Sequence, residues 1–222
     1  MFALQHSAKH KIASNYGKSY YPSDYSPNAG WADYYGNEDF LKAYPNDDRK
    51  EWNYMTEWKI KSGEIIPYTE SADKLPAISK YYDYDEGAPG KSAQSNGITC
   101  IYRYAEVLLM YAEASTRATN SVNQDALNAI QEVQKRAGYQ DRQIELTTTT
   151  EPTAFLAAVS NERGWEFFAE MKRWFELVRL EKVKEVRAEE WDASTFNTNH
   201  HYYFPVPYQQ VDLAGWTNNA GY

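Results

Sequence analysis

The chain has 222 residues and a formal net charge of −8, which argues against a nucleic-acid-binding protein, since phosphate recognition calls for a basic surface. Its length suffices for one substantial domain with a hydrophobic core, and no apolar run reaches the roughly 18 residues that a membrane-spanning helix needs. Cys100 is the only cysteine, so no internal disulfide can form. The 20 Tyr, 7 Trp and 8 Phe make aromatic side chains unusually frequent; such rings pack in cores or contact ligands.

The sequence predicts a loop-rich region over residues 1–100. Phe2–Gln5 is typical of a short strand, whereas residues 14–39 are dense in Gly, Pro, Ser, Asn and Asp and show neither a helical nor a strand period. Residues 46–51 (NDDRKE) indicate a polar turn. Further extended segments are predicted at 52–60, 65–68 and 80–85, followed by a Gly/Pro/Ser-rich loop at 87–97.

A helical core is predicted over residues 101–185. The segment 102–118 has a strong helical pattern of apolar side chains. A second helix is predicted at 123–136, with Asn123 as its N-terminal cap and Gly138 as its stop. Two helices joined by a short link are typical of a helical-repeat pair.

The third helix is predicted to begin at Glu151-Pro152, where the missing N–H of proline is harmless in the first turn. We expect it to run to about Glu170, followed by a shorter helix over 173–184. Residues 186–222 are predicted to form an extended, turn-rich C-terminal tail.

The segment 162–179 (ERGWEFFAEMKRWFELVR) is apolar around most of a helical wheel, which indicates a buried helix. Glu162, Glu166, Glu170 and Arg173 nevertheless follow one another at helical spacing and form a charged stripe. Buried charges need partners, because an isolated one is strongly destabilising. The pattern therefore predicts ion pairs between this helix and a neighbour.

We expect Arg163 or Arg173 to reach Glu106 or Glu113 across that helix interface. A glycosidase would also use paired carboxylates, about 5–10 Å apart around an open cleft. Spacing of four residues in a helix gives such a distance in any protein, and a buried helix denies access to substrate, so ion pairing is the favoured interpretation. The predicted structural ion pairs involve Arg103, Glu106, Glu113, Glu162, Arg163, Glu166, Glu170 and Arg173.

Several blocks of this sequence resemble the SusD/RagB family in the order in which they occur there. The segment 103–114 (RYAEVLLMYAEA) resembles a helix of the family, and 162–179 resembles its ER-x-x-E-F block. The chain departs from the family pattern at positions expected to affect packing, which are Gln131, Gln134, Met171 and Ala220. Met171 replaces a glycine and suggests a weaker helix break at that point. The other matching blocks are Phe2–Gln5, Asp48-Arg49, Arg136–Gly138, Phe204–Pro207 and Gly221-Tyr222.

This resemblance implies a mainly α-helical protein with tetratricopeptide-like helix pairs, long irregular loops and a few short β-hairpins. Family members are surface lipoproteins of the outer membrane that bind glycans in polysaccharide utilisation and pass them to a SusC-like TonB-dependent transporter. They need no cofactor and have no catalytic role. The matching blocks correspond to the C-terminal half of a typical member, so a signal peptide and lipid-anchor cysteine are not expected in this chain.

The aromatic loop at 16–35 is the predicted ligand-binding site. Pyranose rings present apolar C–H faces that stack on Trp and Tyr, while adjacent Asp side chains bind hydroxyl groups. The competing interpretation is that several of these tyrosines only pack the loop onto the helices. The predicted ligand-binding residues are Trp31, Asp33, Tyr34 and Tyr35, followed by Tyr20, Tyr21 and Tyr25.

No metal site is predicted. The His200-His201 pair, His6 and His10 lack Cys, Asp or Glu at a recognisable ligand spacing, and Asp47-Asp48 lacks an EF-hand pattern. The family resemblance and the aromatic loop together make glycan capture for a transporter the leading hypothesis. The whole chain is expected to form a single domain. Capture of a peptide and a ligand-free scaffold that docks on the transporter are the alternatives.

Overall fold

A computed structural model describes residues 1–7, 9–26, 29–82, 96–186 and 197–222. The chain forms two compact units, Met1–Glu170 and Met171–Tyr222, which are described separately. The boundary between the units thus lies inside the segment 162–179, and most of the predicted loop at 87–97 lies outside the described residues.

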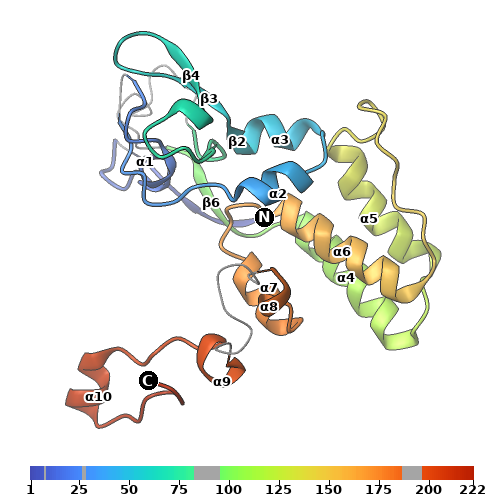
Figure 1. Ribbon diagram of the computed structural model, residues 1–222. Helices are drawn as coiled ribbons and strands as arrows, with labels where there is room; N and C mark the ends of the chain where they lie inside the picture. Colours follow the sequence, from blue (N-terminus) through green and yellow to red (C-terminus); the bar gives the residue numbers. More distant parts are fainter. Residues whose placement is uncertain (8, 27–28, 83–95, 187–196) are drawn as a thin grey trace. The chain divides into compact units, whose positions relative to one another are not determined.

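The first unit combines short β-ribbons with six α-helices of the described chain (Figure 1). Its helices are α1 (Tyr16–Tyr20), α2 (Glu38–Ala43), α3 (Asp48–Asn53), α4 (Tyr104–Thr119), α5 (Gln124–Arg136) and α6 (Pro152–Glu166). Its strands are β1 (Phe2–Gln5), β2 (Tyr54–Met55), β3 (Glu57–Lys59), β4 (Ile65–Pro67), β5 (Ala77–Ile78) and β6 (Ile98–Tyr102), and a 3₁₀ turn, η1, spans Tyr68–Glu70.

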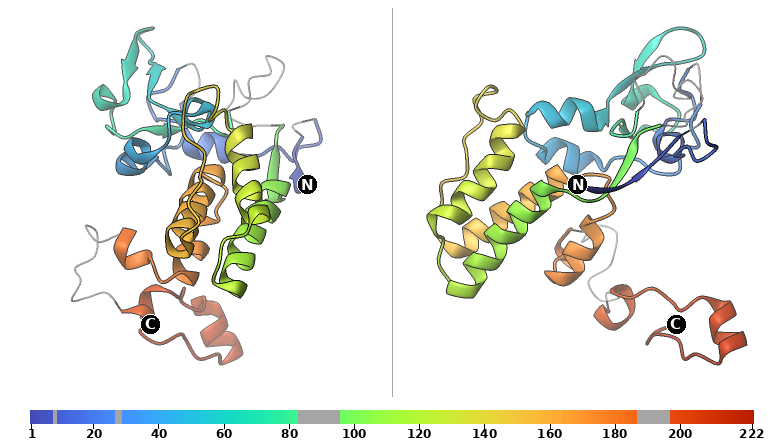
Figure 2. Two further views of the ribbon diagram at one scale, coloured as in Figure 1. Left: turned by 90° about the vertical axis from the view of Figure 1, so that its right-hand side faces the viewer. Right: turned by 180° about the vertical axis from the view of Figure 1, so that it is seen from behind.

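Helices α4, α5 and α6 lie side by side and supply the main hydrophobic core, as Figures 1 and 2 show. The Asn123 side chain accepts a hydrogen bond from the amide of Ala126 and caps α5. At the other end Gly138 has a φ of 82°, a conformation that glycine adopts without strain. The Glu151 side chain caps α6 by accepting hydrogen bonds from the amides of Thr153 and Ala154, and Pro152 occupies the first turn of this helix as predicted.

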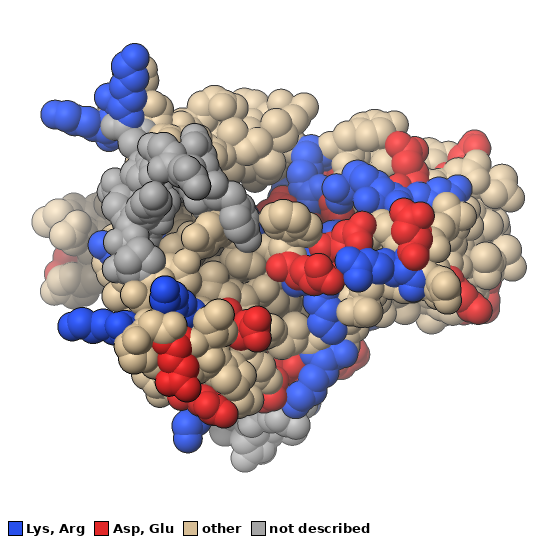
Figure 3. Space-filling model, turned by 90° about the horizontal axis from the view of Figure 1, so that it is seen from above, with Lys and Arg blue, Asp and Glu red and all other residues tan. Residues whose placement is uncertain are grey.

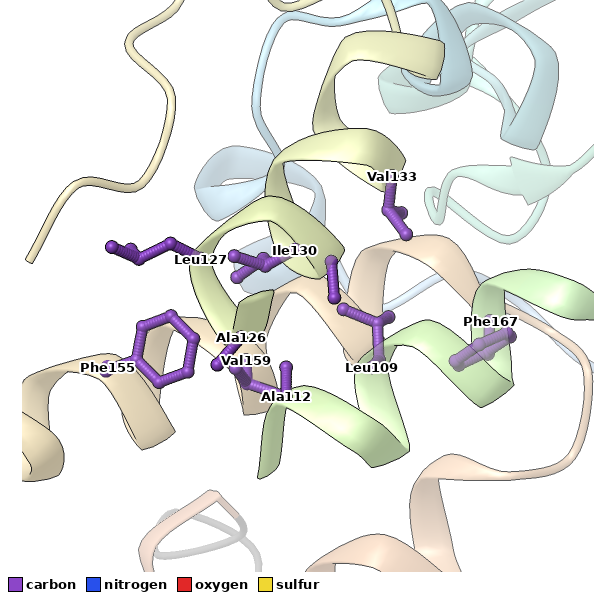
Figure 4. Close-up of a cluster of buried hydrophobic side chains, with 10 residues drawn as sticks. Leu109, Ala112, Ala126, Leu127, Ile130, Val133, Phe155, Val159 and Phe167 are labelled. Atoms are coloured by element: carbon purple, nitrogen blue, oxygen red, sulfur yellow. The ribbon is translucent and has the colours of Figure 1, made fainter. Parts of the chain in front are cut away.

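The core between these helices consists of large apolar side chains that point toward one another (Figure 4). Leu109 of α4, Ile130 of α5 and Phe155 of α6 are all fully buried. Burial of such side chains stabilises a fold by roughly 1.5–3 kcal/mol each. The prediction of a mainly α-helical core is confirmed.

The strands of the first unit pair into three separate antiparallel ribbons. β1 pairs with β6, which continues directly into α4, whereas β2 pairs with β5. β3 and β4 form the predicted hairpin around Gly63, with Trp58 opposite Ile66 and both side chains buried. The structure therefore has ribbons in place of an extended sheet in its described part.

Three predictions for the N-terminal region are wrong in detail. The loop at 14–39 contains the short helix α1, and the predicted turn at 46–51 is largely helix α3. Asp47 accepts a hydrogen bond from the amide of Arg49, so this Asp-rich segment is a helix start. Consequently Trp52 lies in α3, and the extended segment predicted at 52–60 begins only at Tyr54.

The segment 162–179 is not one continuous helix either. α6 ends at Glu166, and Ala169 and Met171 have positive φ values of 59° and 60°. The chain therefore leaves the helical conformation before Met171. The prediction that Met171, in place of glycine, weakens the helix break is wrong. The turn lets Glu170 reach the same arginine as Glu166, so tertiary ion pairing overrides the local helical pattern.

The second unit contains short helices, so the prediction of an extended, turn-rich tail at 186–222 is wrong in part. Its α10 begins directly after Pro207 and is followed by Gly215, which has a φ of 67°; both flanking residues are helix-boundary signals. No helix of the described residues is both long and apolar enough to cross a bilayer. The helices of this unit are α7 (Arg173–Arg179), α8 (Val183–Val186), α9 (Thr198–His201) and α10 (Tyr208–Ala214).

Candidate functional site

The aromatic loop is fixed to the C-terminal end of α1 by backbone hydrogen bonds. The amide of Trp31 donates to the carbonyl of Lys18 at 2.7 Å, and the amides of Asp33 and Tyr34 both donate to Ser19. These bonds satisfy carbonyl groups that a helix end leaves without partners. The loop therefore presents its side chains from a defined backbone.

Close backbone approach explains the glycine that precedes Trp31. The amide of Gly30 donates to Pro22, and a Cβ atom at this position would collide with the backbone of Tyr21. Only glycine fits there without displacing the chain. The loop thus returns tightly across the residues that follow α1.

Two rings and one carboxylate of the predicted ligand set are exposed together on this loop. The side chain of Trp31 is 51% exposed and that of Tyr34 is 60% exposed, and Asp33 between them is also exposed. Exposed aromatic surface beside a carboxylate suits a ligand with one apolar face and hydroxyl groups.

The inner tyrosines of the same set pack against one another. Tyr20 is buried and stacks on Tyr81 at a ring distance of 5.7 Å, while the ring of Tyr34 lies at the same distance, tilted by 54°. Burial, together with Tyr16 and Tyr34, raises the pKa of Tyr20 to about 12. The face of Tyr20 is therefore engaged by neighbouring rings.

Tyr21, Tyr25 and Tyr35 also have partners inside the protein. Tyr21 is buried and contacts the rings of Tyr25 and Tyr82. The hydroxyl of the half-buried Tyr35 donates a hydrogen bond to the carboxylate of Asp73. Burial and this hydrogen bond raise the pKa of Tyr35. The competing interpretation of the loop, self-packing, thus describes the inner rings, while Trp31 and Tyr34 face solvent.

The sequence interpretation missed one cation at this surface. The ammonium of Lys18 lies 5.0 Å from the centre of the Trp31 ring, within the range of a cation–π contact. No helical pattern points to Lys18, because the contact depends on the loop folding back over α1.

The charged stripe of α6 forms a buried network with α3. Arg49 of α3 donates to Glu162 at 2.6 Å, to Glu166 at 2.8 Å and to Asp47 at 2.5 Å. The side chains of these three acids are almost completely buried. Arg49 was not among the predicted ion-pair residues, since α3 was interpreted as a turn.

The same carboxylates are bound by arginines from two further elements. Arg103, just before α4, donates to both Glu166 and Glu170. Arg136 of α5 donates to both oxygens of Glu166, and Lys80 lies 2.6 Å from Glu170. A hollow of about 400 Å³ opens beside this network and is lined by Asp48, Arg49, Trp52, Asn53, Lys80, Cys100, Arg103, Arg136, Ala137, Glu166 and Glu170.

The pKa values of the two central glutamates shift in opposite directions. Burial raises the pKa of Glu162, and Arg49 only partly offsets this effect. Burial acts on Glu166 in the same sense, but Arg103, Arg136 and Arg49 outweigh it and hold the pKa of Glu166 below its usual range. The network thus holds Glu166 in its ionised form.

Of the remaining predicted ion-pair residues, Arg163 and Glu106 approach each other across a helix interface, whereas the others pair within their own helices. Arg163 lies 3.9 Å from Glu106 across the α4–α6 interface, at the outer limit of an ion pair. Glu113 pairs with Arg117 on the same helix. In the second unit Arg173 pairs with Glu176 of α7, so it does not share the stripe with Glu166.

The histidines considered for metal binding lie in other surroundings. His6 contacts the Thr99 hydroxyl, and His200 packs against the Tyr222 ring at 4.2 Å. Within the described ranges, no three His, Cys, Asp or Glu side chains gather as metal ligands would.

On the face shown in Figure 3, positive and negative side chains lie beside one another, so neither sign dominates there.

Comparison with known proteins identifies the family of the chain. "SusD-like protein P2" of Formosa agariphila is 28% identical over 201 residues, which cover 82% of this chain and 39% of that protein. A SusD homolog from Bacteroides thetaiotaomicron superposes with a TM-score of 0.78 at 20% identity, covering 100% of this chain and 51% of that one. A laminarin-binding SusD-like protein superposes with a TM-score of 0.67 at 18% identity, covering 100% and 49%.

The chain spans about half the length of these solved structures and 39% of the curated relative. The SusD family matches residues 2–222, which is nearly the entire sequence. The fold agrees with this match, because the superposition on the SusD homolog covers 100% of this chain. The chain belongs to the SusD family.

Proposed function

We propose that this protein is a non-catalytic glycan-binding component of an outer-membrane nutrient-uptake system. The exposed pair Trp31 and Tyr34 carries this proposal, because both rings stand on a loop that is anchored to α1. A pyranose ring stacks its C–H face on an indole or phenol, and Asp33 accepts hydrogen bonds from its hydroxyls. The laminarin-binding relative supports this class of ligand by its fold.

The carboxylates of α6 argue for a structural role and against glycoside hydrolysis. A glycosidase needs one carboxyl group that donates a proton and a second that faces the substrate in an open cleft. Glu162 and Glu166 are buried and held by arginines, and their oxygens are occupied by charge-assisted hydrogen bonds. In the proposed function the protein therefore binds its glycan without hydrolysing it.

Membership of the SusD family extends the proposal to location and partner. The protein would act at the cell surface and pass its ligand to a SusC-like TonB-dependent transporter in the outer membrane.

Calorimetric titration of the chain with a panel of plant, host and microbial glycans tests the binding site. We expect Trp31→Ala to weaken binding by about 30-fold or more, the effect of removing a central aromatic contact. Trp52→Ala is the matched control, because Trp52 is similarly exposed, at 61%, but lies on α3. Equal losses in both variants, or none in either, would contradict the proposed site. A peptide panel in the same titration tests peptide capture.

An interaction scaffold is a second candidate, favoured by the outer face of α4. Tyr104, Val107 and Tyr111 follow at helical spacing and are 64%, 53% and 45% exposed. Apolar stripes of this kind often mark contact surfaces. Val107→Glu should abolish copurification with a coexpressed SusC-like transporter if this face is the docking surface, and unchanged copurification would refute that role.

A further inference from the structure

We infer that the Trp31 surface selects saccharides that carry an anionic group, a carboxylate or a sulfate ester, beside a pyranose face. This inference rests on the proposed function and names the ligand class of the same site. It starts from Lys18, whose ammonium lies 5.0 Å from the centre of the exposed Trp31 ring. The site thus combines a stacking surface with a positive charge.

The position of Lys18 is set by the backbone of the loop. Because the Trp31 amide donates to the Lys18 carbonyl at 2.7 Å, the backbones of the two residues are held side by side, and their side chains start from neighbouring positions. Among the residues that the structure describes, the Lys18 ammonium has no carboxylate partner, in contrast to Lys80, which pairs with Glu170. Within the described ranges, no carboxylate therefore pairs with the positive charge beside Trp31.

A cation–π contact at an exposed site is weak enough to be exchanged for a stronger one. A ligand carboxylate or sulfate would draw the Lys18 ammonium from the ring into a charge-assisted hydrogen bond, which is about twice as strong as a neutral one. The sugar ring would then stack on Trp31 and Tyr34. A neutral sugar gains only the stacking, so the charge of Lys18 creates a preference between the two ligand classes.

Asp33 fixes the orientation of such a ligand. Asp33 is exposed and stands between Trp31 and Tyr34 in the sequence, and its carboxylate would repel an acidic group that approached it. It accepts hydrogen bonds from hydroxyl groups instead. The anionic group therefore points toward Lys18 and the hydroxyls toward Asp33.

Matched pairs of oligosaccharides test this inference by titration calorimetry. One pair is tetragalacturonate and its methyl ester, in which each carboxylate is replaced by an uncharged ester; the other is a sulfated galactan oligosaccharide and its desulfated form. We expect the wild-type protein to bind at least one acidic member about tenfold more tightly than its neutral partner. The preferred pair distinguishes carboxylate from sulfate, and added salt should reduce the preference.

Three lysine variants separate charge from packing. Lys18→Met keeps the apolar stem and should lose the preference while it retains affinity for the neutral partner. Lys18→Arg should keep the preference, and Lys42→Met, at a lysine paired with Glu38 on α2, should leave both affinities unchanged. Circular dichroism checks that each variant is folded.

Equal wild-type affinity for both members of each pair would overturn the inference, as would a preference that survives in Lys18→Met. Equal affinities for the acidic and neutral members, together with binding that is lost in Trp31→Ala, would overturn the inference alone and would leave the proposed function standing. The absence of binding to any saccharide would overturn both.

Discussion

The charge network around α6 and the aromatic loop around Trp31 use polar and aromatic residues in opposite ways. In the network, Glu162 and Glu166 are withdrawn from water and every charge has a partner from another element. On the loop, Trp31 and Tyr34 remain exposed although apolar burial would stabilise the fold. A buried pairing contributes to specifying the architecture, whereas surface left exposed on a fixed backbone is available to a ligand.

The largest expected effect comes from removing the central cation of the network. Arg49→Met leaves Asp47 and Glu162 buried without their main partner, and we expect a loss of about 3–5 kcal/mol in the free energy of unfolding. Urea denaturation followed by circular dichroism measures this loss. Arg142→Met is the control, because its pairs with Asp48 and Glu51 are exposed to solvent and should contribute little to stability. Similar losses in both variants would erase the distinction between buried and exposed pairs.

The pH dependence of stability gives a second, smaller test. Because the pKa of Glu166 is lower in the folded than in the unfolded chain, its contribution is full above about pH 4.3 and disappears as the pH falls through the folded value. The stability gap between wild type and Glu166→Gln should therefore close on acidification. Glu162 has a raised pKa, so the gap for Glu162→Gln should change with pH in the opposite sense. A parallel response of the two variants would contradict these assignments.

Loss of a helix cap should cost less than loss of the network. Asn123→Ala removes the hydrogen bond to the amide of Ala126 at the start of α5, and we expect a loss of about 1 kcal/mol. Asn128→Ala, in the exposed middle of the same helix, is the control and should change stability by only a few tenths of a kcal/mol. Thermal unfolding of the two variants compares them directly; equal shifts would argue against the cap.

The smallest expected change in stability belongs to Trp31, the residue that we propose as the main contact of the ligand. Trp31→Ala should alter the free energy of unfolding by no more than about 0.5 kcal/mol, as is usual for exposed positions. The same variant should lose glycan affinity in the titration proposed above. A destabilisation as large as that of Arg49→Met would instead place Trp31 among the residues that hold the fold together.

Local signals in the sequence were sufficient for the helical part of the molecule. Asn123 and Gly138 bound α5, and Pro152 opens α6, as their preferences for helix ends predict. The hairpin of β3 and β4 likewise follows from two short apolar segments around Gly63. These features depend on neighbours a few residues apart, so the sequence carries them directly.

The candidate site could be predicted only in part, because it depends on contacts between residues that are far apart in the sequence. Its density of tyrosines in a loop marked the region, but it did not separate Tyr34, which is exposed, from Tyr20 and Tyr21, which are buried. That difference arises when the loop folds back on α1 and the rings of Tyr81 and Tyr82 cover one side. The same return of the loop onto α1 places the Lys18 ammonium beside the Trp31 ring.

The sequence by itself determined the family, the mainly α-helical class and the boundaries of α4 and α5, because capping residues and apolar periodicity act locally. Only the tertiary structure decided that α6 ends at Glu166 and that Arg49 of α3 is its main partner. The physical reason is that a buried carboxylate requires a cation, and the cation comes from more than 100 residues away in the chain.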